Sequence, residues 1–122
     1  MSVTTRAAKA LTITIPEIPP SLNRWSRMHW APKAQEKARW KEMVWASSRG
    51  KPKFMVPVVA TVTYFFKDRR RRDFDNFVPK FVLDGLVGTV LADDDQSHVE
   101  ELRIRFGYDP KHPRTEVTLT PV

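Results

Sequence analysis

The chain contains no cysteine among its 122 residues, which excludes disulfides, thiolate zinc sites and cysteine nucleophiles. It also lacks an apolar run of membrane-spanning length, so we expect no transmembrane helix and no membrane partner. The N-terminal segment has neither a long apolar core nor a cleavage signature, and we expect no signal peptide. These absences favour a protein of a reducing compartment, and we expect a cytoplasmic one.

The composition is that of a small folded protein. Hydrophobic residues make up 41% and charged residues 29% of the chain, which supports a hydrophobic core and argues against disorder. A length of 122 residues suits one compact domain, so we expect residues 1–122 to form a single domain. A domain this short buries a limited fraction of its surface, so dimerisation would add stability.

Positive charge is concentrated in the N-terminal half of the chain. The formal net charge is +7, but residues 1–53 carry a net charge of +8 and residues 81–122 a net charge of −4. Basic proteins bind polyanions through counterion release, and nucleic acid is the commonest such partner. A pI near 10.1 also helps to keep a small protein in solution, so charge alone leaves nucleic-acid binding open.

Alternating or β-branched runs predict four strands, at residues 9–16, 56–67, 99–108 and 115–120. The second run is apolar almost throughout, which predicts a strand that is well covered on both faces. A turn of sequence DPKHPR joins the last two runs, and these most simply form a hairpin.

Two helices complete the predicted fold. Good helix formers at 33–48 place Trp40, Val44 and Met43 on one face of a helix. A second helix is predicted at 77–87, with Asn76 as its N-cap. The order β-α-β-α-β-β predicts an α+β domain with a mixed β-sheet and two helices.

Acidic residues occur in two groups. Asp73 and Asp75 follow a strand, and in extended backbone residues two apart point to the same side. A run of three aspartates at 93–95 follows the second helix, and it returns near the first pair if that helix packs on the sheet. Convergent carboxylates without histidine or cysteine favour Mg²⁺ or Mn²⁺. Phosphodiester hydrolysis is a reaction typical of such sites.

Four consecutive arginines at 69–72 directly precede the first acidic pair. Guanidinium groups match the geometry of phosphate oxygens and would hold a DNA backbone over a metal centre. Each part also has a plainer interpretation, because D-x-D after a strand is common and charged runs are often solvated. The combination favours a metal-dependent nuclease, because each part supplies what the others need.

The motifs follow one another in a specific order and spacing. They are P-P-S-L-N-R at 19–24, R-R-D-F-D-N at 71–76, a lysine at 80, D-G-L at 84–86 and D-D-D-Q at 93–96. In this arrangement the chain resembles the RusA family of Holliday junction resolvases. That family's pattern is approximately R-x-D-x-D-N, a helical lysine, D-x-L and a D-D-x-Q turn before a strand. The resemblance spans most of the chain.

The resemblance implies roles for four residues. Asp73 and Asp75 correspond to the first two catalytic carboxylates. Asp94 best matches the third because it stands two residues before the glutamine, although a register shift of one residue stays open. Asp95 is expected as a further metal ligand.

Lys80 corresponds to the family's catalytic lysine. Three residues separate it from Asn76, where two are expected, and one extra residue turns a helix by about 100°. Lys80 therefore points elsewhere unless the helix begins later and absorbs the insertion. The alternative interpretation is an i,i+4 pair with Asp84, a residue that we expect to be structural.

Further residues are expected to contact DNA. Residues 17–33 are predicted to form a long irregular loop, and such loops are often functional. Trp25 or Trp30 in this loop either stacks on an unpaired base or packs against the protein. The residues expected to contact phosphate are Arg69, Arg70, Arg71, Arg72, Arg24, Arg27 and Lys33.

The resemblance implies a bacterial or phage-encoded homodimer that binds a four-way DNA junction. Each subunit would cut one of two opposing strands by Mg²⁺-dependent hydrolysis, with Mn²⁺ as a substitute and no nucleotide cofactor. Three other functions stay open: a nuclease for other branched DNA, a non-catalytic DNA-binding module, and a basic structural protein of a phage particle. A pure binding module would need no divalent ion and would tolerate Asp75→Asn.

Overall fold

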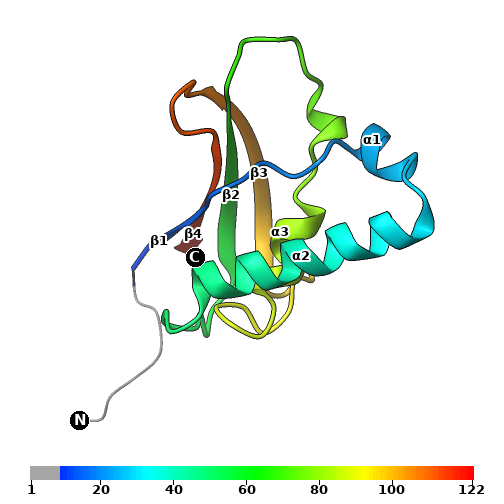
Figure 1. The fold of residues 1–122 in the computed structure, drawn as a ribbon. Helices are drawn as coiled ribbons and strands as arrows, with labels where there is room; N and C mark the ends of the chain where they lie inside the picture. Colours follow the sequence, from blue (N-terminus) through cyan, green and yellow to red (C-terminus); the bar gives the residue numbers. More distant parts are fainter. Residues whose placement is uncertain (1–8) are drawn as a thin grey trace.

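A computed structural model describes residues 9–122 (Figure 1). The elements in chain order are β1 (Leu11–Ile15), α1 (Leu22–Ser26), α2 (Trp30–Ser48), β2 (Val58–Phe66), the 3₁₀ turn η1 (Phe74–Asn76), α3 (Lys80–Leu86), β3 (Val99–Tyr108) and β4 (Arg114–Pro121). The expectation about a signal peptide falls in part on residues 1–8, which lie outside the described residues. Over residues 9–122, none of the helices has the length and apolar character needed to span a bilayer.

The four strands form one mixed sheet in the order β1-β4-β2-β3 (Figure 1). β2 pairs parallel with β3 and antiparallel with β4, which confirms the predicted α+β fold with a mixed sheet. The prediction that β3 and β4 form a hairpin is wrong, because β2 lies between them. The connection from β3 to β4 crosses the end of β2, where the Asp109 N–H donates to the Phe66 carbonyl at 2.8 Å.

The hydrophobic core lies between the sheet and the helices. Alternate residues of β2 from Val58 to Phe66 are buried, whereas the residues between them are partly exposed. The prediction that β2 is well covered on both faces is therefore wrong. Threonines at positions 61 and 63 tolerate the wetter face. Trp40 and Val44, which were predicted to share one face of a helix, are fully buried in α2.

Close packing of α3 on α2 depends on Gly85. A Cβ atom at this position would lie 2.5 Å from the Cβ of Val44, well inside van der Waals contact. Glycine therefore lets the two helices approach more closely than any other residue would. This approach positions both ends of α3, where the candidate site residues lie.

The N-terminal helices differ from the prediction. Residues 17–33 are not one irregular loop, because they contain α1 and the start of α2. The Ser21 hydroxyl caps α1 by accepting from the Arg24 N–H at 3.2 Å. Pro32 lies in the first turn of α2, where its missing N–H has no cost, so the helix begins at Trp30 rather than at 33.

The second predicted helix starts later than expected. α3 begins at Lys80 instead of 77, and Pro79 stands in the N-cap position. The residue before a proline is disfavoured in the helical region, so Val78 prevents the helix from extending toward the N-terminus. The prediction that Asn76 caps this helix is wrong, because Asn76 lies in η1.

Candidate active site

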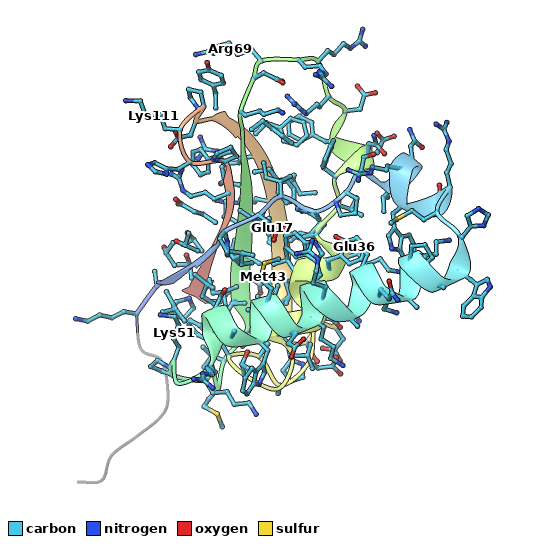
Figure 2. All side chains as sticks on the ribbon, viewed as in Figure 1. Glu17, Glu36, Met43, Lys51, Arg69 and Lys111 are labelled. Atoms are coloured by element: carbon cyan, nitrogen blue, oxygen red, sulfur yellow. The ribbon has the colours of Figure 1, made fainter. Side chains whose placement is uncertain are left out.

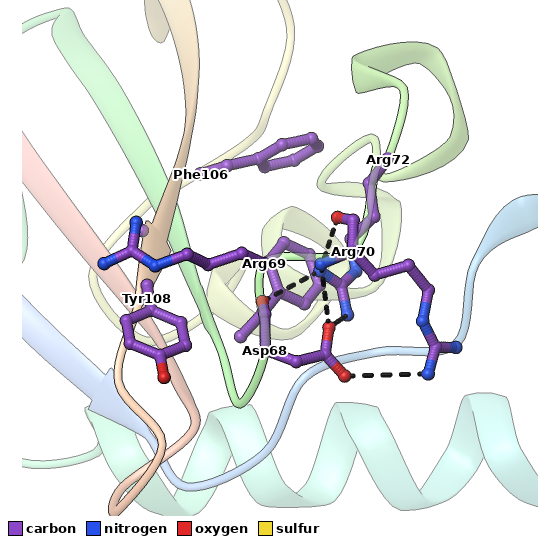
Figure 3. Close-up of a pocket in the computed structure, with 8 residues that line it drawn as sticks. Asp68, Arg69, Arg70, Arg72, Phe106 and Tyr108 are labelled. Carbon is purple, nitrogen blue, oxygen red and sulfur yellow. Dashed lines mark hydrogen bonds and ion pairs between the residues drawn. The ribbon is translucent and has the colours of Figure 1, made fainter.

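The loop after β2 is organised by Arg72. The Arg72 side chain is only 15% exposed and donates to Asp68 Oδ1 at 2.7 Å (Figure 3). It also donates to the carbonyls of Asp68 and Arg70, and its guanidinium lies 3.9 Å from the ring centroid of Phe66. The hydrogen bond from Arg72 lowers the pKa of the Asp68 carboxyl. Arg72 therefore holds the loop together and is committed to contacts within the protein.

The other three arginines are more available to a ligand. Arg69 stacks on Tyr108 with its guanidinium 4.2 Å from the ring centroid, and the Arg70 side chain is 75% exposed. Arg71 is exposed and forms no ion pair with the residues that the structure describes. The loop borders an open pocket of about 260 Å³ (Figure 3), whose cationic rim suits a phosphate. Its lining residues are Phe66, Asp68, Arg69, Arg70, Arg72, Phe106, Gly107 and Tyr108.

Asp73 and Asp75 are both exposed but do not share one extended segment. Asp73 has extended dihedral angles (φ −103°, ψ 140°), whereas Asp75 lies in η1. The expectation that both side chains project from one extended backbone is therefore wrong. Phe74 between them stacks on Phe106 of β3, with ring centroids 4.3 Å apart and planes at 22°. This contact ties the acidic segment to the edge strand of the sheet.

Asn76 joins the acidic segment to α1. Its Oδ1 accepts from the Asn23 N–H at 2.9 Å, although the two residues are 53 positions apart. The early P-P-S-L-N-R motif and the R-R-D-F-D-N motif therefore meet in space (Figure 1). The exposed side chain of Arg24 stands next in sequence to this junction. A contact between two asparagines gives no periodic signal in the sequence, so sequence reasoning missed it.

Lys80 is the first residue of α3, so the extra residue before it lies outside the helix. The expected rotation of 100° therefore does not arise. Lys80 Nζ lies 5.3 Å from the centroid of the Trp25 ring, and Lys33 Nζ lies 4.5 Å from the same centroid. Between residues 9 and 122, no ion pair joins Lys80 to Asp84.

The two tryptophans of the predicted loop have different surroundings. Trp25 packs edge-on against Phe81 with ring centroids 5.5 Å apart, which supports the packing interpretation. Trp30 is 83% exposed at the start of α2 and stays available for stacking.

Asp94, in the loop beyond the C-terminal end of α3, lies close to Asp84 of that helix. Partial burial raises the pKa of the Asp94 carboxyl, and the negative charges of Asp84 and Asp93 raise it further. These carboxylates share a pocket of about 310 Å³ with two lysines of α2. Asp84 therefore belongs to the acidic group, which sequence reasoning did not anticipate. The pocket is lined by Lys37, Lys41, Phe81, Asp84, Val87, Asp93 and Asp94.

Asp95 is already engaged by its neighbours. Its Oδ1 accepts from the N–H and hydroxyl of Ser97, at 3.1 and 2.8 Å, and lies 2.6 Å from His98 Nδ1. The hydrogen bonds from His98 and then Ser97 lower the pKa of Asp95. Within residues 9–122 the Asp94 carboxylate has no serine or histidine partner of this kind, so it is better placed than Asp95 to meet a ligand.

The carboxylates form two groups rather than one. Within residues 9–122, no three side chains of His, Cys, Asp or Glu lie close enough together to hold a metal ion. Asp73 and Asp75 lie before α3. Asp84 lies in the second half of α3, and Asp94 lies in the loop after it. All four offer carboxylate oxygens, the donors that Mg²⁺ and Mn²⁺ prefer, so the donor chemistry fits a hard divalent cation.

Comparison with known proteins identifies the family. No curated protein matched the chain. The family model described as endodeoxyribonuclease RusA matches residues 15–120, which is nearly the whole chain and includes every candidate site residue. This chain belongs to the RusA family and is an endodeoxyribonuclease of the Holliday junction resolvase type.

Proposed function

We propose that this nuclease is a homodimer that resolves a four-way DNA junction by paired, symmetric, Mg²⁺-dependent hydrolysis. The observation that carries the proposal is the position of the exposed carboxylates Asp73 and Asp75 directly after the arginine loop, residues 68–72, at the N-terminal end of α3. The chain matches the family model from residue 15 to residue 120. A two-fold enzyme matches a two-fold junction and supplies one active site for each of two cuts. The products would carry 5′-phosphate and 3′-hydroxyl ends.

Three carboxylates are proposed as the metal ligands. Asp73, Asp75 and Asp94 would hold Mg²⁺, with Mn²⁺ as a substitute, and binding would have to draw the two groups of carboxylates together. Asp95 is engaged by Ser97 and His98 and is not proposed as one of the three ligands. A divalent ion bound there would lower the pKa of an attacking water and stabilise charge on the leaving oxygen. The raised pKa of Asp94 means that a cation beside it would relieve an unfavourable negative charge.

The basic residues would hold the substrate. The Lys80 ammonium lies over Trp25 without an ion-pair partner in the described chain, so it is free to stabilise negative charge on the transferring phosphate. Arg69, Arg70 and Arg71 would contact phosphates at the loop after β2. Arg24, Arg27 and Lys33 would contact a second stretch of backbone. We assign Arg72 to supporting the loop, because its guanidinium is already bound by Asp68.

The direct test is cleavage of a labelled synthetic four-way junction in Mg²⁺ or in EDTA, by the wild-type protein and by Asp75→Asn. We expect paired symmetric nicks by the wild type in Mg²⁺ only, and a variant that binds the junction without cutting it. A junction that is bound but left intact in both Mg²⁺ and Mn²⁺ would replace the resolvase with a DNA-binding module. Equal cutting of flap and four-way substrates would indicate a nuclease for branched DNA in general.

The homodimer is tested separately by sedimentation of the free protein. We expect the mass of two chains. A monomer that nicks only one strand per binding event would contradict the paired mechanism.

A further inference from the structure

The positive charges on the two flanks of α2 are compensated differently. On one flank Arg39 donates to both oxygens of Glu17, at 2.7 and 2.9 Å, and to Glu36 at 2.8 Å. On the other flank Lys37 and Lys41 are exposed. Neither has a carboxylate of residues 9–122 within the 4.0 Å of an ion pair. Their charges are available to an external anion.

The uncompensated lysines form a row. Lys37 and Lys41 are one turn apart on α2, and Lys33 continues the row by one turn toward the N-terminus. Four residues of helix advance about 6 Å along the axis. The row therefore begins at the Trp25 ring, which Lys33 shares with Lys80, and ends at the pocket that contains Asp94.

We propose that Lys37 and Lys41 bind phosphates of the DNA strand that passes Asp84 and Asp94. A strand carries one phosphate for every ~3.4 Å of helix axis, so lysines about 6 Å apart would meet roughly every second phosphate. The proposal rests on the proposed function, because it treats the acidic pocket as part of the site that cuts DNA.

The chemistry of the pocket explains why lysines are needed there. A DNA strand that approaches Asp84, Asp93 and Asp94 is repelled by three negative charges. Two cations on the same pocket wall offset this repulsion and attract the phosphates. If they served only to neutralise the aspartates, close ion pairs would be expected, and neither lysine forms one with the described residues.

The first experiment compares two double variants that each remove two positive charges. Lys37→Ala/Lys41→Ala changes the proposed row, and Lys9→Ala/Lys51→Ala changes exposed lysines elsewhere, with Lys51 beyond the C-terminal end of α2 (Figure 2). Binding of a labelled four-way junction is measured by fluorescence anisotropy in EDTA over a series of salt concentrations. We expect the slope of log affinity against log salt to fall by about 1.8 in the first variant and by less than half of that in the second. Lys37→Arg/Lys41→Arg should restore the wild-type slope.

The second experiment uses the absence of native cysteine. Lys37→Cys carries the only thiol in its chain, so it can be cross-linked to a thiol tethered to one chosen phosphate of the junction. We expect cross-linking to phosphates next to the cut site, and none there for Lys51→Cys. Circular dichroism and the melting temperature verify that each variant is folded.

The outcomes separate this proposal from the proposed function. Equal slopes for the two double variants, or cross-linking of Lys37→Cys only far from the cut site, would overturn the role of the lysines while junction cleavage by the wild type still stands. A wild-type protein that binds but never cuts the junction would overturn the nuclease mechanism, and the salt slopes would still report whether the lysines contact DNA.

Discussion

The two groups of carboxylates at the ends of α3 lie in different surroundings. Asp73 and Asp75 are exposed beside the arginine loop, in a segment that Phe74 ties to β3. Asp84 and Asp94 share a pocket with two lysines of α2, where desolvation and the negative charges of Asp84 and Asp93 raise the pKa of the exposed Asp94 carboxyl. The first group lies in the segment before α3, whereas the second combines Asp84 of α3 with Asp94 of the loop that follows this helix.

Successive elements of the motif lie in separate parts of the fold, so a substitution can disturb one group of carboxylates and leave the other intact. Catalysis through a metal would need both groups at once. Variants confined to one end of α3 therefore test whether the two groups act together.

The largest effect is expected for Asp94→Asn. Metal stabilisation of charge is worth several kcal/mol, so loss of a ligand should lower the cleavage rate by at least ~10²-fold. Asp95→Asn is the matched control and should cost less than about tenfold, because Asp95 is engaged by Ser97 and His98. Single-turnover cleavage of saturating junction in Mg²⁺ measures both. A larger loss for Asp95→Asn would move the third ligand by one residue.

The next effect concerns the position of α3. Gly85→Ala places a methyl group against Val44 and should lower the free energy of unfolding by about 2 kcal/mol, measured by urea denaturation. Val44→Ala makes room for that methyl group, so the double variant should lose less stability than the two single variants predict together. Strict additivity would show that this contact does not set the distance between the helices.

The arginine loop provides a smaller and more selective contrast. Arg71→Ala should leave the melting temperature unchanged and lower the salt slope of junction binding by about 0.9, because it removes one phosphate contact. Arg72→Ala should lower the melting temperature, because Asp68 loses its partner and Phe66 its stacked guanidinium. Thermal denaturation and salt-dependent anisotropy measure the two properties. The reverse pattern would exchange the roles assigned to these neighbours.

The smallest expected effect is a change in one titration. The negative charge of Asp84 disfavours ionisation of Asp94, so Asp84→Asn should lower the pKa of Asp94 and shift its titration to lower pH. Carboxyl-carbon NMR over a pH series measures this shift, with Glu100→Gln as a control on the neighbouring strand. An unchanged Asp94 titration would mean that the two carboxylates do not interact.

The strands and the buried face of α2 could be predicted because their signals are local. The run predicted as a strand at 99–108 has the same bounds as β3, Val99–Tyr108. Trp40 and Val44 lie one turn apart on the side of α2 that faces the core. The strand order could not be predicted, because the choice between a hairpin and insertion beside β2 depends on contacts distant in the sequence. Pro79 could have indicated the later start of α3, since proline restricts the residue before it.

The arrangement of the candidate site residues could not be predicted from the sequence, and their roles stay predictions. Spacing indicated Asp73 and Asp75, and the family resemblance indicated Asp94, but the proximity of Asp84 to Asp94 depends on the path of the chain after α3. Four identical arginines in a row give no sequence signal that distinguishes Arg72. Its role follows from the positions of Asp68 and Phe66 in the folded loop.

The most direct test of the account is Mn²⁺ binding, measured by electron paramagnetic resonance in the presence of an uncleavable four-way junction. We predict that the wild type binds Mn²⁺ and that Asp75→Asn and Asp94→Asn each weaken binding at least ~10-fold. Asp109→Asn is the control, because that carboxylate is bound to Arg114 in the β3–β4 connection. Loss of Mn²⁺ binding in only one of the two variants would contradict the claim that both ends of α3 contribute to one metal site.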